Sequence, residues 1–426
     1  MEVAQPQVRV LNRHGTTVRS SRGESNPRSH MSRRIPSLLV VLCLVAVACT
    51  PGDDTTVAAA PTRAPTTTTT STLATTTTTE SITIAGAPDG LVAQVEAFYA
   101  YALGATAVAP PMPAAVLASI APVKTGAPRS GVASVGDLLG QSVATVEMGT
   151  DLFLAVDDGG GWRIVGGQWP SLSIPTYFGQ GPRLVAVVGS DARPGQAVAR
   201  TRADSIHFVG LDGNGSGAVV GVPRDSYVPV PGRGKTKINS SLSSGGPETM
   251  MATFGELTGL PFEGYVITGF SGFTSLLGDV LGGVTLDVPF AISDRWAHVS
   301  LSAGVQLLTG AQALGFARAR KTVPGGDLTR SGHQGVILIA AAQAVQALGY
   351  GALPRLLESS EPHIVTNLTP EQLLTFSAMV ISADLDSVIN VVAPGSPGSA
   401  GGASVVYLSK SVSGLWADLA DGRIDG

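Results

Sequence analysis

The chain has 426 residues, enough for two or three domains with large buried cores, and 44% of its residues are apolar, which is typical of globular rather than disordered proteins. Its formal net charge is −4, with 27 basic and 31 acidic residues, and seven of the arginines precede residue 35. Because the rest of the chain is more acidic still, it lacks the broad basic surface by which proteins bind nucleic acid. We therefore expect no nucleic-acid partner.

The N-terminal region is typical of a secretion signal. An apolar run of 11 residues, 38–48, follows two arginines and ends in small residues before Cys49. It is shorter than the ~20 residues that span a bilayer, and its pattern is that of a lipoprotein signal. We predict that residues 1–48 are upstream sequence and signal peptide, with the true start at Met31 and lipidation at Cys49. An uncleaved signal anchor is the alternative, and both interpretations tether the protein to the outer face of the cell membrane.

Residues 49–84 are predicted to form a disordered stalk. Twelve threonines occupy the 18 positions 62–79, and such a stretch has too few apolar side chains to form a core. The only cysteines are Cys43 and Cys49, so a chain lipidated at Cys49 contains no disulfide and depends on its hydrophobic core.

Residues 88–175 are predicted to form a small α+β domain of unknown role. Apolar spacing predicts helices at 89–102 and 113–120, and alternation predicts strands at 142–148 and 152–156 and a return strand from 162. Asp157 and Asp158 lie between the last two strands. They are either metal ligands or, the interpretation that we favour, the polar tip of a hairpin.

The second region, residues 183–420, begins with three apolar strands predicted at 184–188, 205–211 and 218–222. Asp204 opens the second of these strands and Arg224 follows the third, its antiparallel partner across a hairpin turn, so both lie at the same edge of the sheet. If the first strand is also antiparallel to the second, Asp191 and Arg193 join them there.

A second group of charged residues lies about a hundred residues further along. We predict a helix at 307–314 that leads into an extended segment, in which Arg318 and Arg320 point to one face. Asp327 is placed to cap an apolar helix over residues 328–348.

That apolar helix carries Arg330 and Gln334 one turn apart on a shared face. Two interpretations of the charged groups remain open. The arginines are either ion-paired with the nearby aspartates as a structural network, or they bind phosphate oxygens, with a hard cation such as magnesium bridging carboxylate and pyrophosphate. The residues alone indicate an anion site, with or without a metal.

Several ordered blocks lie between residues 189 and 334: Gly189-Ser190-Asp191-Ala192-Arg193, Arg202-Ala203-Asp204-Ser205, Val222-Pro223-Arg224-Asp225-Ser226, Phe316-Ala317-Arg318-Ala319-Arg320, Gly326-Asp327, Arg330 and Gln334. In this order they closely resemble the LytR-CpsA-Psr family. The resemblance covers residues 183–420 and none of residues 88–175. It implies a three-layer α/β/α domain with a central mixed sheet and a deep apolar pocket for a lipid.

The resemblance also implies an activity: transfer of a glycopolymer from a polyprenyl-pyrophosphate carrier to peptidoglycan during cell envelope assembly, with Mg²⁺ or Mn²⁺ as cofactor. By matching motifs, Asp191 and Asp204 would hold the metal, and either Asp191 or Asp225 would deprotonate the incoming hydroxyl. The pyrophosphate would lie among Arg193, Arg202, Arg224, Arg318, Arg320, Arg330 and Gln334. Of these groups, we expect catalysis from Asp191, Arg224, Asp225, Arg318 and Arg320.

One position departs from the family pattern, since His333 stands where the family usually has a second arginine before the glutamine. We expect it to keep a hydrogen-bond donor to the phosphate. Val336, Leu338 and Ile339 are candidates for the wall of the lipid pocket, and packing against the sheet is the alternative. Two other functions remain open: a non-catalytic lipoprotein that binds polyprenyl lipid or wall, and a pyrophosphatase that acts on the lipid carrier.

Overall fold

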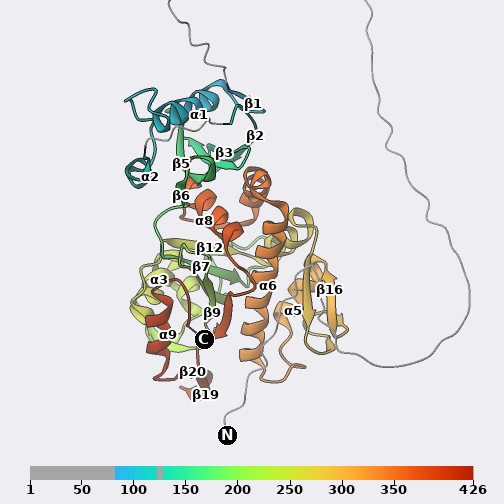
Figure 1. Cartoon of the computed structure of the whole chain (residues 1–426). Helices are drawn as coiled ribbons and strands as arrows, with labels where there is room; N and C mark the ends of the chain where they lie inside the picture. The colour runs from blue at the N-terminus through green and yellow to red at the C-terminus, as the bar shows by residue number, and fades with distance from the viewer. Residues whose placement is uncertain (1–81, 122–127, 426) are drawn as a thin grey trace, which may run out of the picture. The chain divides into compact units, whose positions relative to one another are not determined.

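The computed structural model describes residues 82–121 and 128–425, in which two six-stranded sheets are each packed against helices (Figure 1). The predictions for the signal, Met31, Cys49 and the stalk lie outside the described residues. Whether residues 88–175 and 183–420 are separate domains stays a prediction, since both belong to one compact unit.

The first sheet contains β1 (Thr83–Ala85), β2 (Ser130–Leu138), β3 (Gln141–Met148), β4 (Asp151–Asp157), β5 (Trp162–Trp169) and β6 (Ile174–Tyr177), in that order. Its helices are α1 (Asp89–Ala102) and α2 (Ala114–Ser119). These bounds confirm the predicted helices, hairpin strands and α+β class. The prediction missed β2, whose small and polar residues give little alternation; its residues 132–138 pair with β3.

The core of this first part is aromatic. Phe98 of α1 stacks on Trp169 of β5, with ring centroids 5.1 Å apart, and meets Phe153 of β4 edge to face. At the tip of the β4–β5 hairpin, Asp157 accepts hydrogen bonds from backbone N–H groups of the turn, as does Asp158. The hairpin-tip interpretation of these two aspartates is therefore confirmed.

The central sheet has the order β17 (Val365–Thr366), β12 (Gly264–Thr268), β7 (Arg183–Ser190), β8 (Ala203–Leu211), β9 (Gly217–Gly221) and β18 (Ile389–Val392). It is mixed, because β7 is antiparallel to β8 but parallel to β12, and β9 is antiparallel to β8 but parallel to β18.

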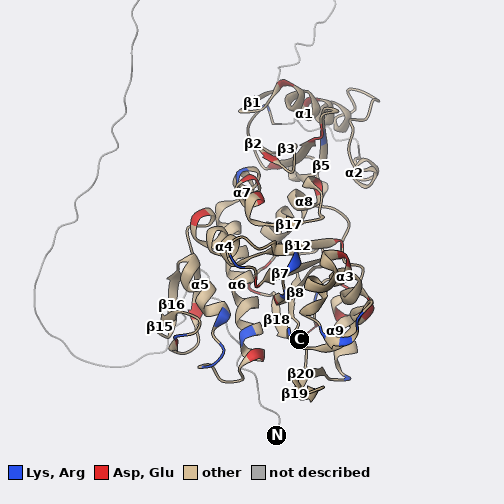
Figure 2. Cartoon of the chain, turned by 180° about the vertical axis from the view of Figure 1, so that it is seen from behind, with Lys and Arg blue, Asp and Glu red and all other residues tan. Residues whose placement is uncertain are grey.

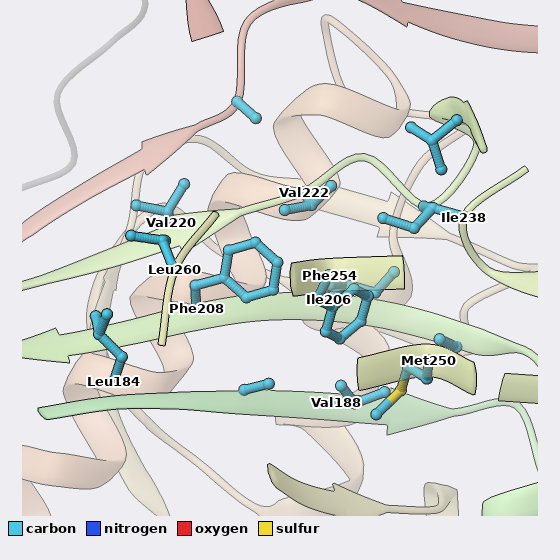
Figure 3. Close-up of a cluster of buried hydrophobic side chains, with 14 of the residues drawn as sticks. Leu184, Val188, Ile206, Phe208, Val220, Val222, Ile238, Met250, Phe254 and Leu260 are labelled. Atoms are coloured by element: carbon cyan, nitrogen blue, oxygen red, sulfur yellow. The ribbon is translucent and has the colours of Figure 1, made fainter. Parts of the chain in front are cut away.

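Helices cover both faces of the central sheet (Figure 1). On one face lie α3 (Ser240–Thr258) and α9 (Val412–Leu419), and on the other lie α6 (Asp327–Leu348), α7 (Leu353–Ser360) and α8 (Pro370–Ser382). The predicted α/β/α architecture is therefore confirmed. Figure 3 shows the core beneath α3, where Phe208 of β8 meets Phe254 with ring centroids 5.1 Å apart.

The apolar cluster between α6, α7, α8 and the central sheet also includes side chains of the first sheet. Leu138 and Val143 of that sheet share this cluster with Leu353 of α7 and Leu374 of α8. An ion pair of 2.6 Å between Arg163 and Glu371 lies at the same junction. The first sheet is thus packed directly on the helical layer of the second.

The remaining elements border the central sheet. They are the hairpins β10 (Tyr227–Val230) with β11 (Gly234–Lys237), β13 (Val284–Val288) with β16 (Gly304–Leu308), β14 (Ile292–Asp294) with β15 (Val299–Leu301), and β19 (Gly395–Ala400) with β20 (Ala403–Leu408), together with α4 (Phe270–Ser275) and α5 (Gly310–Arg318). Short 3₁₀ turns lie at Pro170–Leu172, Val198–Arg200, Tyr350–Ala352 and Glu361–His363, and a π-helical turn at Leu276–Val280.

Two sequence predictions near α5 are wrong. The helix predicted at 307–314 is instead the end of strand β16 followed by α5, because Thr309 begins the helix through a capping box with Gln312. Arg318 is consequently the last residue of that helix and does not belong to an extended segment shared with Arg320.

The long helix α6 confirms the predicted apolar helix, but Asp327 does not cap it. Gly326 occupies the cap position, and the Asp327 carboxylate instead pairs with arginines. Within the described ranges, no single helix has both the length and the hydropathy of a membrane span; α6 meets them only jointly with residues 350–363, across a bend of 98°.

A candidate anion site at the edge of the central sheet

The antiparallel register of β7 and β8 brings the first charged motifs together. Ser190 pairs with Ala203, so Asp191 lies opposite Arg202 just beyond the pair. The backbone N–H of Asp191 donates to the carbonyl of Arg202 at 3.0 Å, and the Arg202 N–H donates to the Asp191 carboxylate at 2.9 Å. The sequence prediction that Asp191 joins Asp204 at one edge of the sheet is therefore confirmed.

An ion-pair network connects this edge to α6. Asp204 pairs with Arg224, which follows β9, and lies 3.6 Å from Arg330 of α6. Arg330 also pairs with Asp327 at 2.9 Å, and Arg320 lies 3.6 Å from the same carboxylate. Three guanidinium groups thus share two carboxylates, which leaves the network with an excess of positive charge.

Burial shapes the electrostatics of this network. It lowers the pKa of Arg330, and the positive charge of Arg224 acts in the same direction, although Asp327 opposes both. For Arg224, burial alone lowers the pKa, but Asp204 and Asp327 more than offset it and raise the pKa above its ordinary value. The Nε donors of Arg224 and Arg330 are buried and have no hydrogen-bond acceptor among the described residues, although the Nε of Arg224 lies 3.7 Å from a carboxylate oxygen of Asp327. An oxyanion among these side chains would supply the missing acceptor oxygens.

A second group of predicted residues gathers around Phe270, the first residue of α4. The guanidinium of Arg318 lies 4.7 Å from the centroid of this ring, and that of Arg193 lies 5.9 Å from it. Within the described part of the chain, neither of these arginines has a carboxylate within 4 Å, and the same holds for Arg202. The interpretation as a structural network therefore accounts for Arg224, Arg320 and Arg330 but leaves these three arginines unexplained.

Figure 2 shows basic residues at the same end of α5 and α6, where α5 finishes and α6 begins. Asp294, which sequence reasoning missed, organises this end. Its buried carboxylate accepts the backbone N–H groups of Arg320 at 3.2 Å and Lys321 at 3.3 Å, together with those of Trp296 and Ala297. Burial alone would raise its pKa, but these hydrogen bonds hold the pKa below its usual value. Nothing in the sequence separates Asp294 from an ordinary polar turn residue.

Two other predicted residues have more limited contacts. Asp225 pairs with Lys237 of β11 at 2.9 Å, and Gln334 donates to the carbonyl of Ala317 at 3.0 Å, which ties α6 to the last turn of α5. In this arrangement the Gln334 amide holds the arginine-bearing helix end in place. Within the described ranges, it makes no hydrogen bond to the arginine side chains themselves.

The ring of His333 packs between two helices. Its ring is buried and stacks on Phe316, with centroids 4.3 Å apart and planes inclined by 17°. Burial lowers its pKa to about 4, so the ring is neutral near pH 7. Its Nδ1 atom is buried and has no hydrogen-bond partner among the described residues, so the expectation that His333 donates to a phosphate stays a prediction.

The predicted metal ligands fit a hard divalent cation in kind and number. Asp191 and Asp204 supply carboxylate oxygens at one edge of the sheet, and Mg²⁺ commonly takes one or two carboxylates beside phosphate oxygens and water. In the structure, the Asp204 oxygens meet Arg224 and Arg330, so a cation would share that carboxylate with them. Among the described residues, no group of three or more His, Cys, Asp or Glu side chains could hold a metal ion by itself. Phosphate oxygens of a substrate or water molecules would have to complete the coordination.

Known proteins resemble the part of the chain that carries this site. LcpB of Corynebacterium glutamicum, named a probable cell wall biosynthesis protein, is 35% identical over 34% of this chain and 37% of its own length. TagV of Bacillus subtilis is 31% identical over 39% of this chain and 45% of its own length. TagU of Bacillus cereus is 32% identical over 45% of this chain and 62% of its own length. Both Tag proteins are named polyisoprenyl-teichoic acid–peptidoglycan teichoic acid transferases.

The matched stretches thus span from about a third to under two thirds of these relatives. The crystal structure of B. subtilis TagV superposes with a TM-score of 0.50 and 25% identity, covering 57% of this chain and 98% of TagV. The model of the LytR_cpsA_psr family matches residues 171–419, more than half of the chain, and includes every predicted site residue except Cys49. This chain therefore belongs to the LytR-CpsA-Psr family.

Proposed function

We propose that this protein transfers a glycopolymer from a polyprenyl-pyrophosphate carrier to a hydroxyl group of peptidoglycan. The observation that carries the proposal is the arginine cluster of Arg224, Arg320 and Arg330, in which two buried Nε donors have no hydrogen-bond acceptor among the described residues. Three further arginines, Arg193, Arg202 and Arg318, have no carboxylate within 4 Å in the same part of the chain. A pyrophosphate offers several anionic oxygens to such donors. The names of TagU and TagV support the substrate class, because each names a polyisoprenyl-linked polymer and peptidoglycan.

The arginines would act by holding the pyrophosphate and by stabilising the charge that develops on it. The acceptor hydroxyl oxygen attacks the phosphorus that carries the sugar, and a new oxygen–phosphorus bond forms. The bond from that phosphorus to the bridging oxygen breaks, and polyprenyl phosphate leaves with the electron pair. Arg224 and Arg330, whose Nε donors have no hydrogen-bond acceptor among the described residues, would bind the bridging and leaving oxygens.

The proton of the acceptor hydroxyl must pass to a base, and the chain offers two carboxylates for it. Among the described residues, the side chain of Asp191 accepts only a backbone N–H, whereas Asp225 forms an ion pair with Lys237. An Mg²⁺ or Mn²⁺ ion held by Asp191 and Asp204 would neutralise charge on the pyrophosphate oxygens. The pH dependence of the transfer rate is measured for Asp191→Asn and for Asp225→Asn separately. The base is the aspartate whose substitution removes that pH dependence.

The lipid part of the substrate is proposed to lie along α6. Leu338 keeps partial exposure, whereas Val336 is buried in the cluster beneath the β13–β16 hairpin and Ile339 is also buried. Packing therefore accounts for Val336, and Leu338 is the better candidate to contact an isoprenoid chain. On the facing sheet, Val187 of β7 and Val266 of β12 are also partly exposed apolar residues.

We further propose that the protein acts outside the cytoplasm, held at the membrane by lipid on Cys49. Palmitate-analogue labelling should mark the wild-type chain and leave Cys49→Ala unlabelled. Equal labelling of both chains would remove the lipoprotein assignment and leave the signal anchor.

The transfer itself is tested with full-length protein, a synthetic polyprenyl-pyrophosphoryl saccharide, peptidoglycan and Mg²⁺. We expect saccharide to become linked to peptidoglycan by the wild-type protein and not by Arg224→Ala or Asp204→Ala. Arg355→Ala is the matched control and should leave transfer unchanged, because this exposed arginine pairs with Glu358 of its own helix α7. Tight binding of the lipid without transfer would identify a non-catalytic lipid-binding protein.

A further inference from the structure

Trp296 is an exposed aromatic side chain beside the arginine cluster. It lies in the turn between β14 and β15, and 47% of its surface is accessible. The other tryptophans of the chain, Trp162, Trp169 and Trp416, are all buried. Nothing in the transfer reaction proposed above uses this residue.

Two cations lie against the Trp296 ring. The guanidinium of Arg295 is 4.3 Å from its centroid and the ammonium of Lys321 is 4.1 Å from it, both within the range of cation–π attraction. Both residues are exposed, and neither has a carboxylate within 4 Å in the described ranges of the chain. The stretches 295–303 and 318–326 contain no acidic residue, although the chain as a whole is acidic.

The Trp296 turn is joined rigidly to the anion site. Asp294 accepts the N–H groups of Trp296 at 2.9 Å and of Arg320 and Lys321 at 3.2 and 3.3 Å, so one carboxylate fixes both segments. Arg320 in turn pairs with Asp327 of the network. The exposed ring and its two cations therefore have a fixed position next to the residues proposed to bind the carrier's pyrophosphate.

We propose that Trp296, Arg295 and Lys321 form a contact site for an anionic lipid surface, which orients the anion site toward the membrane. Tryptophan prefers the interface between lipid and water, and lysine and arginine beside it attract anionic headgroups. The inference rests on the proposed function, because a carrier lipid resides in the membrane.

A neutral saccharide is the other partner that an exposed tryptophan suggests, and the contacts disfavour it. A sugar ring binds by stacking on the aromatic face, where the two cations already lie. Anionic headgroups can instead bind Arg295 and Lys321 without displacing them from the ring. Charge complementarity thus selects the lipid surface.

The test uses Trp296 as its own probe. Full-length protein is reconstituted into vesicles of brominated phosphatidylglycerol or of brominated phosphatidylcholine, and quenching of tryptophan fluorescence by the bromine atoms is measured. Because the other tryptophans are buried, we expect quenching to come from Trp296, to be lost in Trp296→Phe, and to be at least twofold stronger in phosphatidylglycerol.

Charge variants identify the cause. The double variant Arg295→Gln/Lys321→Gln should reduce quenching in phosphatidylglycerol to the phosphatidylcholine level. The matched control Arg355→Gln/Lys410→Gln removes two cations from exposed positions elsewhere and should quench like the wild type. Equal quenching in both lipids, or no quenching, would overturn the proposal.

Transfer from a water-soluble short-chain carrier analogue, measured on the same protein, separates this inference from the proposed function. Transfer without quenching refutes only the membrane contact. Quenching without transfer supports the contact and counts against the proposed enzyme.

Discussion

The Nη1 atom of Arg330 lies 3.6 Å from Oδ2 of Asp204, and this pair joins the first turns of α6 to strand β8. Arg330 is 5% exposed and also pairs with Asp327. The same guanidinium groups therefore hold the edge of the sheet together and offer donors to an anion. Stability and substrate binding are coupled at this edge, which gives the two classes of arginine different expected phenotypes.

Arg330→Met is expected to destabilise the protein by about 3–5 kcal/mol, because it leaves Asp204 and Asp327 with less positive charge in a buried setting. Urea unfolding measures the change. Arg355→Met, which breaks an exposed pair on α7, should cost less than about 1 kcal/mol. Similar losses for the two variants would contradict the role given to the network.

Arg193→Ala and Arg318→Ala are expected to weaken the interaction with the substrate without destabilising the fold. Both guanidinium groups lie against Phe270 and have no carboxylate to release, so the free energy of unfolding should change by no more than about 0.5–1 kcal/mol. The KM for the pyrophosphate carrier should rise about tenfold, since each lost charged hydrogen bond is worth roughly 1.5–3 kcal/mol. An unchanged KM would place these arginines outside the substrate site.

Asp294→Asn should impair transfer by displacing Arg320, because the amide loses the charge that holds the N–H groups of Arg320 and Lys321. We expect a loss of about 1–3 kcal/mol in stability and a rate lowered about 10- to 100-fold.

Asp151→Asn is the matched control for that variant. Asp151 is a buried aspartate of the first sheet that accepts from Tyr99 and Ser171, so its substitution should also destabilise the fold. It should leave both the KM for the carrier and the rate unchanged. Equal kinetic effects of the two variants would show that Asp294 acts only through global stability.

We expect the protein to lose stability in acid, because His207 and His333 are buried in their neutral form. Burial lowers the pKa of His207 to about 4, with the charge of Arg330 adding to the effect while the carbonyl of Ser331 opposes it, and burial lowers the pKa of His333 to about 4. A histidine in the unfolded chain has a pKa near 6.5, so between pH 6.5 and 4 the unfolded state binds more protons.

The free energy of unfolding should therefore be highest above pH 6.5. It should fall as the pH drops toward 4, by about 3 kcal/mol for each histidine. Urea unfolding at pH 7 and pH 4.5 measures the slope. His333→Phe keeps the stacking on Phe316 and removes one titrating group, so it should flatten the slope. An unchanged slope would mean that His333 is accessible to protons in the folded protein.

The sequence predicted the elements whose signals are local. Strands β7, β8 and β9 and helix α6 were predictable from apolar runs, and the hairpin placed Asp204 and Arg224 at one edge. The helix start at Thr309 was misjudged, because strand β16 and helix α5 are both apolar and only the capping box separates them.

The parts of the site that depend on tertiary contacts were not predictable. Phe270 and Asp294 lie on other elements than the arginines that they contact, and neither belongs to a recognisable motif. Asp327 is a strong helix-cap residue by its sequence position, yet three neighbouring arginines attract its carboxylate instead. The sequence predicts His333 to be a polar group of the site. Its stacking on Phe316 depends on the packing of α5 against α6 and is not visible in the sequence.

The most direct test of the central claim is the ratio of two products. Polyprenyl phosphate released and saccharide linked to peptidoglycan are counted in the same reaction, with and without the acceptor. A transferase releases one polyprenyl phosphate for each saccharide linked and releases almost none without peptidoglycan. Release that proceeds equally without the acceptor would contradict the account and identify a pyrophosphatase, with water in place of the sugar hydroxyl.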